Sequence, residues 1–368
     1  MQLQLTIVGL PQSGKTTVFN ALTRSTAETG GFSSGEEEPN LATVKVPDQR
    51  VDVLTEMFNP RRTVYADVRY LDVAGFARGL GKQGLGGRLL APLAEADALI
   101  VVVRAFEDED VPHPDETVDP LRDLETLLLE FTFSDLGIVE KRLARIEQTI
   151  SKLRGTEREA YERESALLRR CQSALEDGTA LHEITLDDDE RKMLRGFGFL
   201  TQKPILVLLN VGEQQLGEPA ALLIAAARAQ AERPGVEIEA LAAKIEMEIG
   251  QLDPDDTVVF MDDLGIAESS LDRVIRLSYH LLGLVSFLTV GDDEVRAWPI
   301  RNGWSAVEAA AEIHSDIARG FIRAEVVSYD ELITCGGLQE ARKAGQLRSE
   351  GKTYLMRDGD VVNFLFNV

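Results

Sequence analysis

Short, nearly continuous apolar runs alternate with amphipathic stretches in the first part of the 368-residue chain. Runs that lack polar alternation are typical of strands buried on both faces of a parallel sheet. The predicted strands are 4–10, 68–73, 98–105, 204–210 and 236–243. Amphipathic segments between them, such as 16–22 and 219–232, predict helices. We therefore expect an α/β domain with a mostly parallel sheet.

A heptad pattern interrupts this domain between residues 134 and 199. Gly155 supplies a turn between two helical patterns in which apolar residues recur at spacings of three and four. The residues of the apolar stripe are Leu136, Val139, Leu143, Ile146, Ile150, Leu153, Leu168, Cys171 and Leu175. We expect an antiparallel coiled-coil hairpin at 134–199, inserted into a nucleotide-binding domain that comprises 1–133 and 200–284.

The character of the chain changes again from about residue 285. The segments 295–300, 321–327 and 354–357 are β-like, and 306–318 predicts an amphipathic helix. Asp358-Gly359 is a turn signal, and the residues from Val362 to Val368 alternate as in a strand. We expect a small α+β domain at 285–368, with a mixed sheet and a helix across it.

Composition narrows the classes of protein to which the chain can belong. Two distant cysteines, Cys171 and Cys335, make neither a disulfide framework nor a metal cage, which fits a reducing cytoplasm. The apolar runs are too short to cross a bilayer, and the start has no signal-peptide pattern, so we expect a cytoplasmic protein without membrane contact. The net charge of −23 repels nucleic acid, so any RNA contact requires a local basic face.

A phosphate-binding motif follows the first predicted strand. Residues 9–16, GLPQSGKT, match G-x-x-x-x-G-K-[ST], in which backbone N–H groups and a helix N-terminus face a polyphosphate. Lys15 is expected to reach the β and γ phosphates, and the Thr16 hydroxyl to bind Mg²⁺. The expected nucleotide-binding residues here are Gly9, Pro11, Gln12, Ser13, Gly14, Lys15, Thr16 and Thr17.

A second motif, D-x-x-G, ends the strand at 68–73. Asp72 is the expected partner of the magnesium ion, and Gly75 is expected to offer its N–H to the γ phosphate, so that Lys15 and Gly75 act in hydrolysis. The next residue is Phe76, where regulatory GTPases carry a glutamine that orients the attacking water. Either the protein hydrolyses slowly, or another group positions the water, such as backbone groups of the Gly-rich loop 79–87 or His113. A histidine in such a place is more often an ordinary surface loop residue.

The expected base site lies after the strands at 204–210 and 236–243. Asn210-Val211-Gly212-Glu213 stands where GTPases carry N-K-x-D, and the longer Glu213 cannot pair with guanine as the aspartate does. Asn210 can serve an adenine edge, and Val211 can pack on the ring. Ala243 and Lys244 can retain a backbone contact to the base. Adenine is therefore favoured over guanine, and the alternative is a divergent GTPase.

With these motifs the chain resembles the YchF family, the Obg-like ATPases of the translation-factor class of P-loop proteins. The resemblance extends over nearly the whole chain and includes 104–108, 243–246, 320–326 and 358–368. It implies an ATP-preferring P-loop G domain with a coiled-coil insertion and a C-terminal TGS domain, which is a ubiquitin-like β-grasp. It also implies association with the ribosome and an apolar residue at position 76.

Three positions depart from the family pattern. Gln12-Ser13 replace the usual Asn-Val, and because that asparagine helps to hold K⁺ in related enzymes, activation by K⁺ is in doubt. Glu36 falls where a magnesium-sensing threonine is expected, so its carboxylate is a further candidate ligand of Mg²⁺. Ala242 replaces a small polar residue or cysteine. These departures identify a divergent paralogue.

Three functional hypotheses follow. The first is a slow, Mg²⁺-dependent ATPase switch, monomeric, that contacts rRNA of the ribosome or its large subunit through the TGS and coiled-coil faces. The C-terminal basic residues available for this are Arg296, Arg301, Arg319, Arg323, Lys343, Arg348 and Lys352. The second is an Obg-class GTPase. The third is a nucleotide-stabilised binding module with negligible hydrolysis, for which Phe76 and Glu36 argue.

Overall fold

The computed structural model describes residues 3–24, 40–73, 87–231, 234–253, 256–257, 259, 261 and 269–367. Glu36, Gly75 and Phe76 lie outside the described residues, as does the loop 79–86. The chain divides into two compact units. The larger unit comprises 4–42 and 70–271, and the smaller unit comprises 1–3, 43–69 and 272–368.

A six-stranded sheet forms the centre of the larger unit, in the order β2-β4-β1-β5-β6-β7. Its strands are β1 (Gln4–Val8), β2 (Asn40–Lys45), β4 (Asp67–Asp72), β5 (Ala98–Arg104), β6 (Ile205–Asn210) and β7 (Val236–Leu241). The pairs β1–β5, β5–β6 and β6–β7 are parallel. Every residue of β5 and β6 is buried, which is the physical reason for their continuous apolar sequences. The five predicted strands and the parallel sheet are confirmed.

Helices cover this sheet and fix the loops at its carboxyl edge. They are α1 (Lys15–Thr23), α4 (Gly87–Glu95), α5 (Pro120–Ile150), α8 (Glu218–Ala231) and α9 (Ala243–Ile249). The next helix, α11 (Ser270–Leu281), belongs to the smaller unit from Asp272 onward. Leu124 and Leu127 of α5 and Ala227 of α8 share one core with the inner residues of β5, β6 and β7. The core therefore holds the ends of β5 and β6 beneath the loops that follow them.

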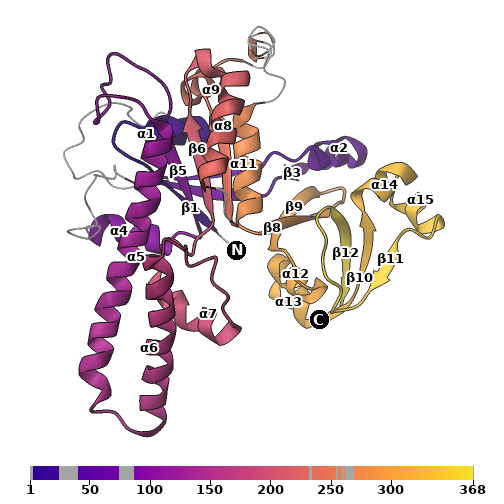
Figure 1. Ribbon diagram of the computed structural model, residues 1–368. Coiled ribbons are helices and arrows are strands. Elements are labelled where there is room, and N and C mark those ends of the chain that lie inside the picture. Colours follow the sequence, from indigo (N-terminus) through magenta and orange to yellow (C-terminus); the bar gives the residue numbers. More distant parts are fainter. Residues whose placement is uncertain are drawn as a thin grey trace. The chain divides into compact units, whose positions relative to one another are not determined.

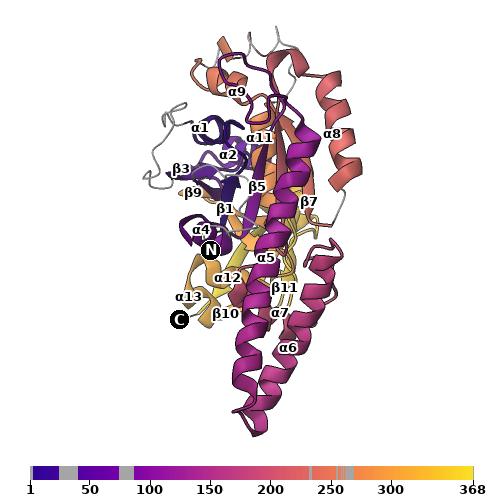
Figure 2. The same ribbon diagram turned by 60° about the vertical axis from the view of Figure 1, so that its left-hand side comes forward.

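The inserted hairpin consists of α5 and α6 (Gly155–Glu176), which lie side by side in Figures 1 and 2. Val139, Leu143 and Ile146 of α5 pack with Leu168, Cys171 and Leu175 of α6 in a core of their own. The predicted stripe is confirmed except for Leu153, which follows the end of α5 and is not part of this core. Arg142 forms two hydrogen bonds of 2.7 Å with Glu164 across the hairpin. The helix does not begin near residue 134, since α5 is continuous from Pro120, where Asp119 caps it by accepting from the N–H of Arg122. The short helices α7 (Asp188–Leu194), capped by Asp187, and η1 (Arg195–Phe197) lead the chain back to the sheet.

A buried carboxylate joins the hairpin to the sheet. Asp135 of α5 is fully buried and accepts hydrogen bonds from the N–H of Leu200 (2.9 Å) and from the N–H (2.8 Å) and hydroxyl (2.7 Å) of Thr201. Burial raises the pKa of Asp135 to about 6, against the lowering effect of these donors. Three converging donors hold the carboxylate at the point where the returning chain enters the larger unit.

A mixed sheet forms the centre of the smaller unit, in the order β11-β10-β12-β8-β9-β3. Its strands are β3 (Arg62–Val64), β8 (Leu284–Thr289), β9 (Glu294–Arg301), β10 (Phe321–Ser328), β11 (Arg348–Glu350) and β12 (Asp360–Phe366). Its helices are α2 (Gln49–Phe58), α12 (Ala306–Ile313), α13 (Ser315–Arg319), α14 (Tyr329–Cys335) and α15 (Leu338–Lys343). Ala306, Ala309 and Ala310 of α12 pack on Phe287 and Phe364. A helix across a mixed sheet is the arrangement that a β-grasp requires.

Two expectations for this unit are wrong. Residues 354–357 do not form a strand, because their backbone groups bond to the 304–306 segment instead, with Leu355 in an isolated bridge to Ser305. The predicted helix 306–318 breaks at His314, which is extended (φ −165°) and whose side chain accepts from the N–H of Asp316 to start α13.

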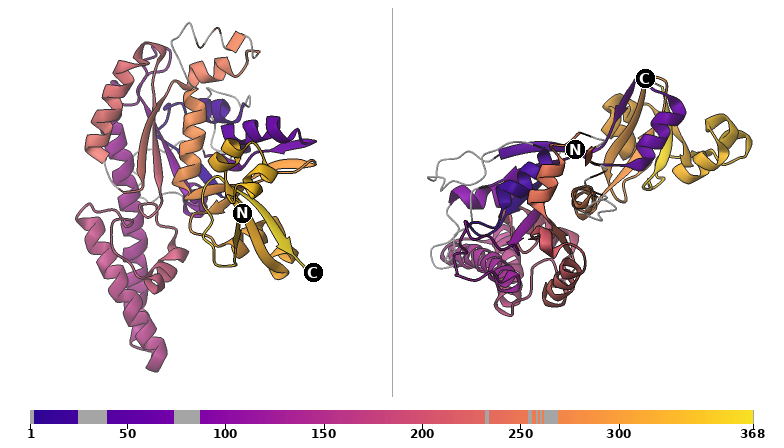
Figure 3. Two further views of the ribbon diagram at one scale, coloured as in Figure 1. Left: turned by 90° about the vertical axis from the view of Figure 1, so that its right-hand side faces the viewer. Right: turned by 90° about the horizontal axis from the view of Figure 1, so that it is seen from above.

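Residues 43–69 belong to the smaller unit, and no pattern in the sequence predicted that they would join it. The strand β3 pairs in parallel with β9, and Figure 3 shows the indigo-purple segment beside the orange strands. Arg50 of α2 donates to Asp48 and, at 2.7 Å, to Asp358 of the turn before β12. The domain boundaries inferred from the sequence stay predictions.

Candidate nucleotide site

Two glycines give the 9–16 loop its path between β1 and α1. A Cβ atom on Gly9 would lie 2.3 Å from the carbonyl oxygen of Val102. Gly14 has φ +87°, and a Cβ atom there would lie 2.3 Å from Nδ2 of Asn210. Both distances are far inside van der Waals contact, and a positive φ is unfavourable for residues with a side chain. Only glycine fits at either position, so the loop backbone can approach neighbouring chain segments and present its N–H groups to a ligand.

Lys15 is folded back over this loop. Its ammonium group donates to the carbonyl oxygens of Gly9 (3.1 Å) and Leu10 (2.9 Å), and the residue is buried. Burial lowers the pKa of Lys15 to about 8, and the nearby carboxylate of Asp72 partly opposes this shift. An anionic phosphate beside the amine would favour its charged form, so the site is prepared for a negatively charged ligand.

Thr16 and Asp72 come together from two different elements. The Thr16 hydroxyl at the start of α1 donates to Oδ2 of Asp72, at the end of β4, over 3.1 Å. A hydroxyl and a carboxylate are hard oxygen donors, which suit Mg²⁺ when phosphate and water supply the other ligands. Within the described part of the chain no group of three or more His, Cys, Asp or Glu side chains could hold a metal ion by itself. The Thr16 hydroxyl and the Asp72 carboxylate fit a divalent cation whose other ligands are phosphate and water oxygens.

Asn210 fastens the phosphate loop to the base side of the site. Its Nδ2 donates to the carbonyl oxygen of Ser13 (3.1 Å), and its Oδ1 accepts from the N–H of Ala243 (3.3 Å) at the start of α9. The residue is only 4% exposed. These contacts give Asn210 a positioning role, and its contact with an adenine edge stays a prediction.

The other residues expected at the base differ in exposure. Glu213 is exposed in the short helix η2 (Glu213–Gln215), and Lys244 is exposed at the start of α9, so both can reach a ligand. Ala243 is fully buried and offers only backbone. Val211 is buried in the core with Leu124, so a stacking contact of its side chain with the base stays a prediction.

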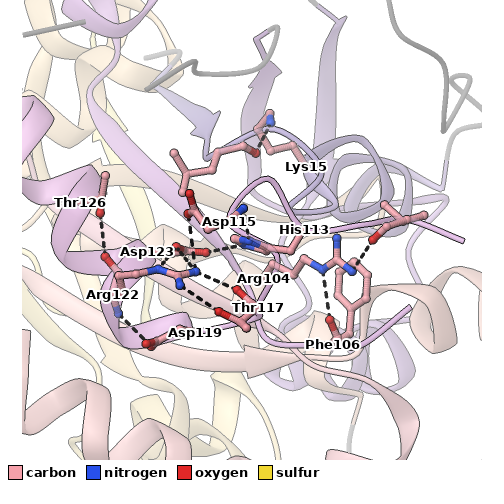
Figure 4. Close-up of polar contacts among 12 residues, drawn as sticks. Lys15, Arg104, Phe106, His113, Asp115, Thr117, Asp119, Arg122, Asp123 and Thr126 are labelled. Atoms are coloured by element: carbon pink, nitrogen blue, oxygen red, sulfur yellow. Dashed lines mark hydrogen bonds and ion pairs between the residues drawn. The ribbon is translucent and has the colours of Figure 1, made fainter. Parts of the chain in front are cut away.

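Phe106 lies at the site although the motifs do not single it out as a ligand. One edge carbon of its ring is 3.6 Å from the position of a Cβ atom on Gly14, so the ring borders the phosphate loop. The guanidinium carbon of Arg104 lies 4.5 Å from the ring centroid, and Nε of Arg104 donates to the carbonyl oxygen of Phe106 (Figure 4). Arg104 is 2% exposed, and burial lowers its pKa. The available signal was an aromatic residue two positions after β5, at the edge where the other site residues gather.

His113 is held in a buried polar network (Figure 4). Its Nε2 lies 2.8 Å from Oδ2 of Asp123, and its Nδ1 accepts from the N–H of Asp115. Because Nδ1 accepts, the ring proton resides on Nε2 and is donated to Asp123. Arg122 donates to the other oxygen of Asp123 from Nε and Nη2. Both nitrogens of His113 therefore have protein partners here, and a role in positioning water requires the ring to leave Asp123.

Strand β1, a glycine-dependent loop, a buried lysine and the Thr16–Asp72 pair together define a P-loop protein that binds nucleoside triphosphates. Residues 4–139 match the family model described as 50S ribosome-binding GTPase. Residues 284–367 match the C-terminal model of YchF GTPases, described as a protein of unknown function (DUF933). The chain belongs to the YchF family.

Relatives match the chain from end to end. The ribosome-binding ATPase YchF of Bacillus subtilis is 40% identical over 370 residues, which cover 100% of each chain. That of Escherichia coli O157:H7 is 39% identical over 363 residues, 98% of each chain. The solved structure of the Schizosaccharomyces pombe YchF GTPase has a TM-score of 0.84 at 29% identity and covers 99% of this chain and 98% of its own. The predicted family and α/β fold are thereby confirmed. Among the described residues no helix is long and apolar enough to cross a membrane.

Proposed function

We propose that this protein is a ribosome-associated switch that binds ATP with Mg²⁺ and hydrolyses it slowly. The observation that carries the proposal is the phosphate site. There Asn210 and Phe106 lie against the loop at Ser13 and Gly14, next to the Thr16–Asp72 pair. The end-to-end likeness to the ribosome-binding ATPases YchF supports the assignment of nucleotide and partner.

Adenine rather than guanine is the proposed base. Guanine recognition in GTPases depends on an aspartate that accepts from N1–H and the amino group, and Glu213 stands in its place, one methylene longer. The exposed Glu213 carboxylate is not fixed by a hydrogen bond that would aim it at a base within the described residues. Phe106 offers an apolar edge at the loop, which is indifferent to the hydrogen-bonding pattern of the base.

Thr16 and Asp72 are the proposed protein groups at Mg²⁺, which, when bound with ATP, neutralises charge on the β and γ phosphates. Glu36 is proposed as a third oxygen ligand in the triphosphate state. Lys15 would leave the carbonyl oxygens of Gly9 and Leu10 and donate to the phosphates, and Gly75 would donate its N–H to the γ phosphate. The hydroxyl and carboxylate at 3.1 Å and the two exchangeable lysine bonds support these roles.

The path of the chain suggests how the nucleotide state would reach the smaller unit. Residues 43–69 belong to that unit, where β3–β9 pairing and the Arg50–Asp358 ion pair hold them. At its N-terminal end this segment overlaps residues 26–45, which, we propose, ATP orders through Mg²⁺ and hydrolysis releases, and at its C-terminal end it continues through β4 to Asp72. An order–disorder change at the γ phosphate would therefore act on both ends of a segment anchored in the smaller unit.

The proposed ribosomal contact uses the C-terminal TGS domain and the coiled-coil hairpin. Because the chain carries a net charge of −23, binding to rRNA must rely on locally basic positions such as Arg323, which is exposed on β10. We further propose that the protein is a cytoplasmic monomer and that Gln12 deprives it of activation by K⁺.

Titration with labelled ATP and GTP tests the base assignment, with Lys15→Ala as a control that removes the phosphate contact. Tighter binding of ATP is expected, and GTP binding that equals or exceeds it would reject the adenine assignment. Co-sedimentation with purified ribosomal subunits at two salt concentrations tests the partner. Binding that weakens with salt is expected, because phosphate contacts release counterions, and no co-sedimentation at low salt would reject the ribosomal role.

A nucleotide-stabilised binding module is the second candidate, and the sequestration of His113 by Asp123 favours it. Single-turnover hydrolysis separates the two. A rate for the protein that is indistinguishable from that of Lys15→Ala identifies the module, whereas a rate that falls on substitution identifies the ATPase.

A further inference from the structure

A cavity of about 350 Å³ lies at the carboxyl edge of the larger sheet, apart from the phosphate loop. Its apolar lining residues are Ala105, Val118, Pro120, Val211, Pro219, Ala220 and Leu223. Volumes of this size and lining of this kind are typical of sites that take a ligand. Glu107 and Gln215 are the polar lining residues.

Neighbouring residues of the same two chain segments contact the phosphate loop and line the cavity. After β5, Phe106 borders Gly14, whereas its neighbours Ala105 and Glu107 line the cavity. At the end of β6, Asn210 contacts the phosphate loop, whereas the next residue, Val211, lines the cavity. Phe106 and Asn210 therefore link the phosphate loop to the cavity through their neighbours in sequence.

Negative charge is concentrated beside the cavity. Residues 104–123 run from the last residue of β5 through the connecting loop into the first turn of α5, and they carry eight acidic residues against two arginines, a net charge of −6 in twenty residues. The segment includes the exposed run Glu107, Asp108, Glu109 and Asp110, of which Glu107 lines the cavity. A field of this sign attracts cations and repels nucleic acid.

Gln215 cannot serve as a polar anchor for a ligand, because its carboxamide is already engaged. Its Nε2 donates to the carbonyl oxygen of Ala105 (2.9 Å), and its Oε1 accepts from the N–H of Gly212 (2.8 Å). These two bonds span the ends of β5 and β6 and keep the cavity open between the segments. The walls are thus preformed and apolar, and the attraction for a partner comes from the acidic rim.

We propose that this cavity, with the acidic run Glu107–Asp110, binds a basic protein segment that inserts one aliphatic side chain between lysine or arginine residues. The aliphatic group fills the apolar walls, and the flanking cations pair with the rim carboxylates. The shared position of Phe106 and Asn210 beside both sites lets such a segment sense, or alter, the occupancy of the phosphate loop.

Fluorescence anisotropy with the full-length protein tests this proposal. The probes are the labelled peptides Lys-Lys-Leu-Lys-Lys and Lys-Lys-Ser-Lys-Lys and a single-stranded RNA oligonucleotide. We expect saturable binding of the leucine peptide, about tenfold tighter than that of the serine peptide, because the cavity removes the aliphatic side chain from water. Equal affinities for the two peptides, no saturation up to about 1 mM, or tighter binding of the RNA would each overturn the proposal.

Matched variants assign the binding to the cavity. Ala220→Leu places a larger side chain on the cavity wall and is expected to abolish the preference for leucine, whereas Ala226→Leu, at an exposed position of the same helix, is expected to leave it unchanged. Glu107→Gln with Glu109→Gln should weaken both peptides, and Glu157→Gln with Glu159→Gln on the hairpin should not. Ala220→Leu that retains the wild-type preference, or equal losses in the two charge pairs, would refute the assignment. Wild-type thermal unfolding in each variant establishes that the fold is intact.

Discussion

The variant Asn210→Ala distinguishes two possible roles of this residue, positioning of the phosphate loop and recognition of the base. The asparagine joins the carbonyl oxygen of Ser13 to the N–H of Ala243 at 4% exposure, so alanine leaves one buried acceptor and one buried donor without partners. A buried polar group that loses its partner costs roughly 1–3 kcal/mol, so the loss of both partners should lower the free energy of unfolding of the larger unit by about 2–6 kcal/mol without any nucleotide. Structural alteration of the phosphate loop should then weaken binding of ATP and GTP alike.

The assay combines two measurements on the same protein. Hydrogen exchange of the Ala243 amide and denaturant unfolding in the absence of nucleotide report on the positioning role, and calorimetric titration with ATP and GTP reports on the base. Glu213→Ala is the control, because this exposed side chain should change nucleotide preference and leave unfolding unaffected. Unchanged unfolding and amide protection in Asn210→Ala, together with a selective loss of ATP binding, would refute the reasoning from the structure.

Four further predictions concern other parts of the molecule. Asp135→Asn should remove a pH dependence: the folded pKa of about 6 lies above the ordinary value of 3.8, so this contribution to stability is present below about pH 4 and lost as the pH rises through 6, a difference on the order of 3 kcal/mol between wild type and variant in unfolding measured across that range. Phe106→Ala should weaken ATP binding about tenfold in calorimetry, since apolar contact at the loop is lost. Gln12→Asn should raise the melting temperature slightly, because position 12 has φ +60°, which asparagine tolerates better, and should bring K⁺ activation in a hydrolysis assay. Asp358→Ala should destabilise the smaller unit more than Arg50→Ala, because Asp358 also accepts from the buried N–H of Ser286 (2.8 Å), whereas Arg50→Ala removes only the partly exposed ion pairs with Asp48 and Asp358, each of which contributes at most about 1 kcal/mol.

Each of these has an outcome that contradicts it. Parallel pH profiles of wild type and Asp135→Asn would show that this carboxylate does not titrate between pH 4 and 6. Undiminished ATP affinity after loss of the Phe106 ring would remove it from the site. An asparagine at position 12 that leaves the rate independent of K⁺ would place the cause of K⁺ independence elsewhere, and equal unfolding of the last two variants would mean that the Ser286 bond is immaterial.

The patterns that the sequence determined alone are local ones. Strands β1, β5, β6 and β7 could be predicted from the sequence because a strand buried on both faces must be apolar throughout. The phosphate loop could be predicted because a turn that exposes its N–H groups needs glycine at fixed positions. The heptad stripe of the hairpin could be predicted because one face of each helix must be buried. Family membership followed from these motifs.

Only the tertiary structure decided which residues meet. Asn210 ends β6, and the sequence predicts that it contacts the base. Its amide instead forms hydrogen bonds with Ser13 and Ala243, which are distant in sequence. The sequence does not distinguish His113 from an ordinary loop histidine, and only the structure shows its hydrogen bond with Asp123. The segment 43–69 joins the C-terminal sheet through β3, a three-residue edge strand whose short, half-exposed sequence carries no strand signal of its own. Such contacts depend on the order of strands and on which loop ends share an edge, and neither is encoded within a window of neighbouring residues.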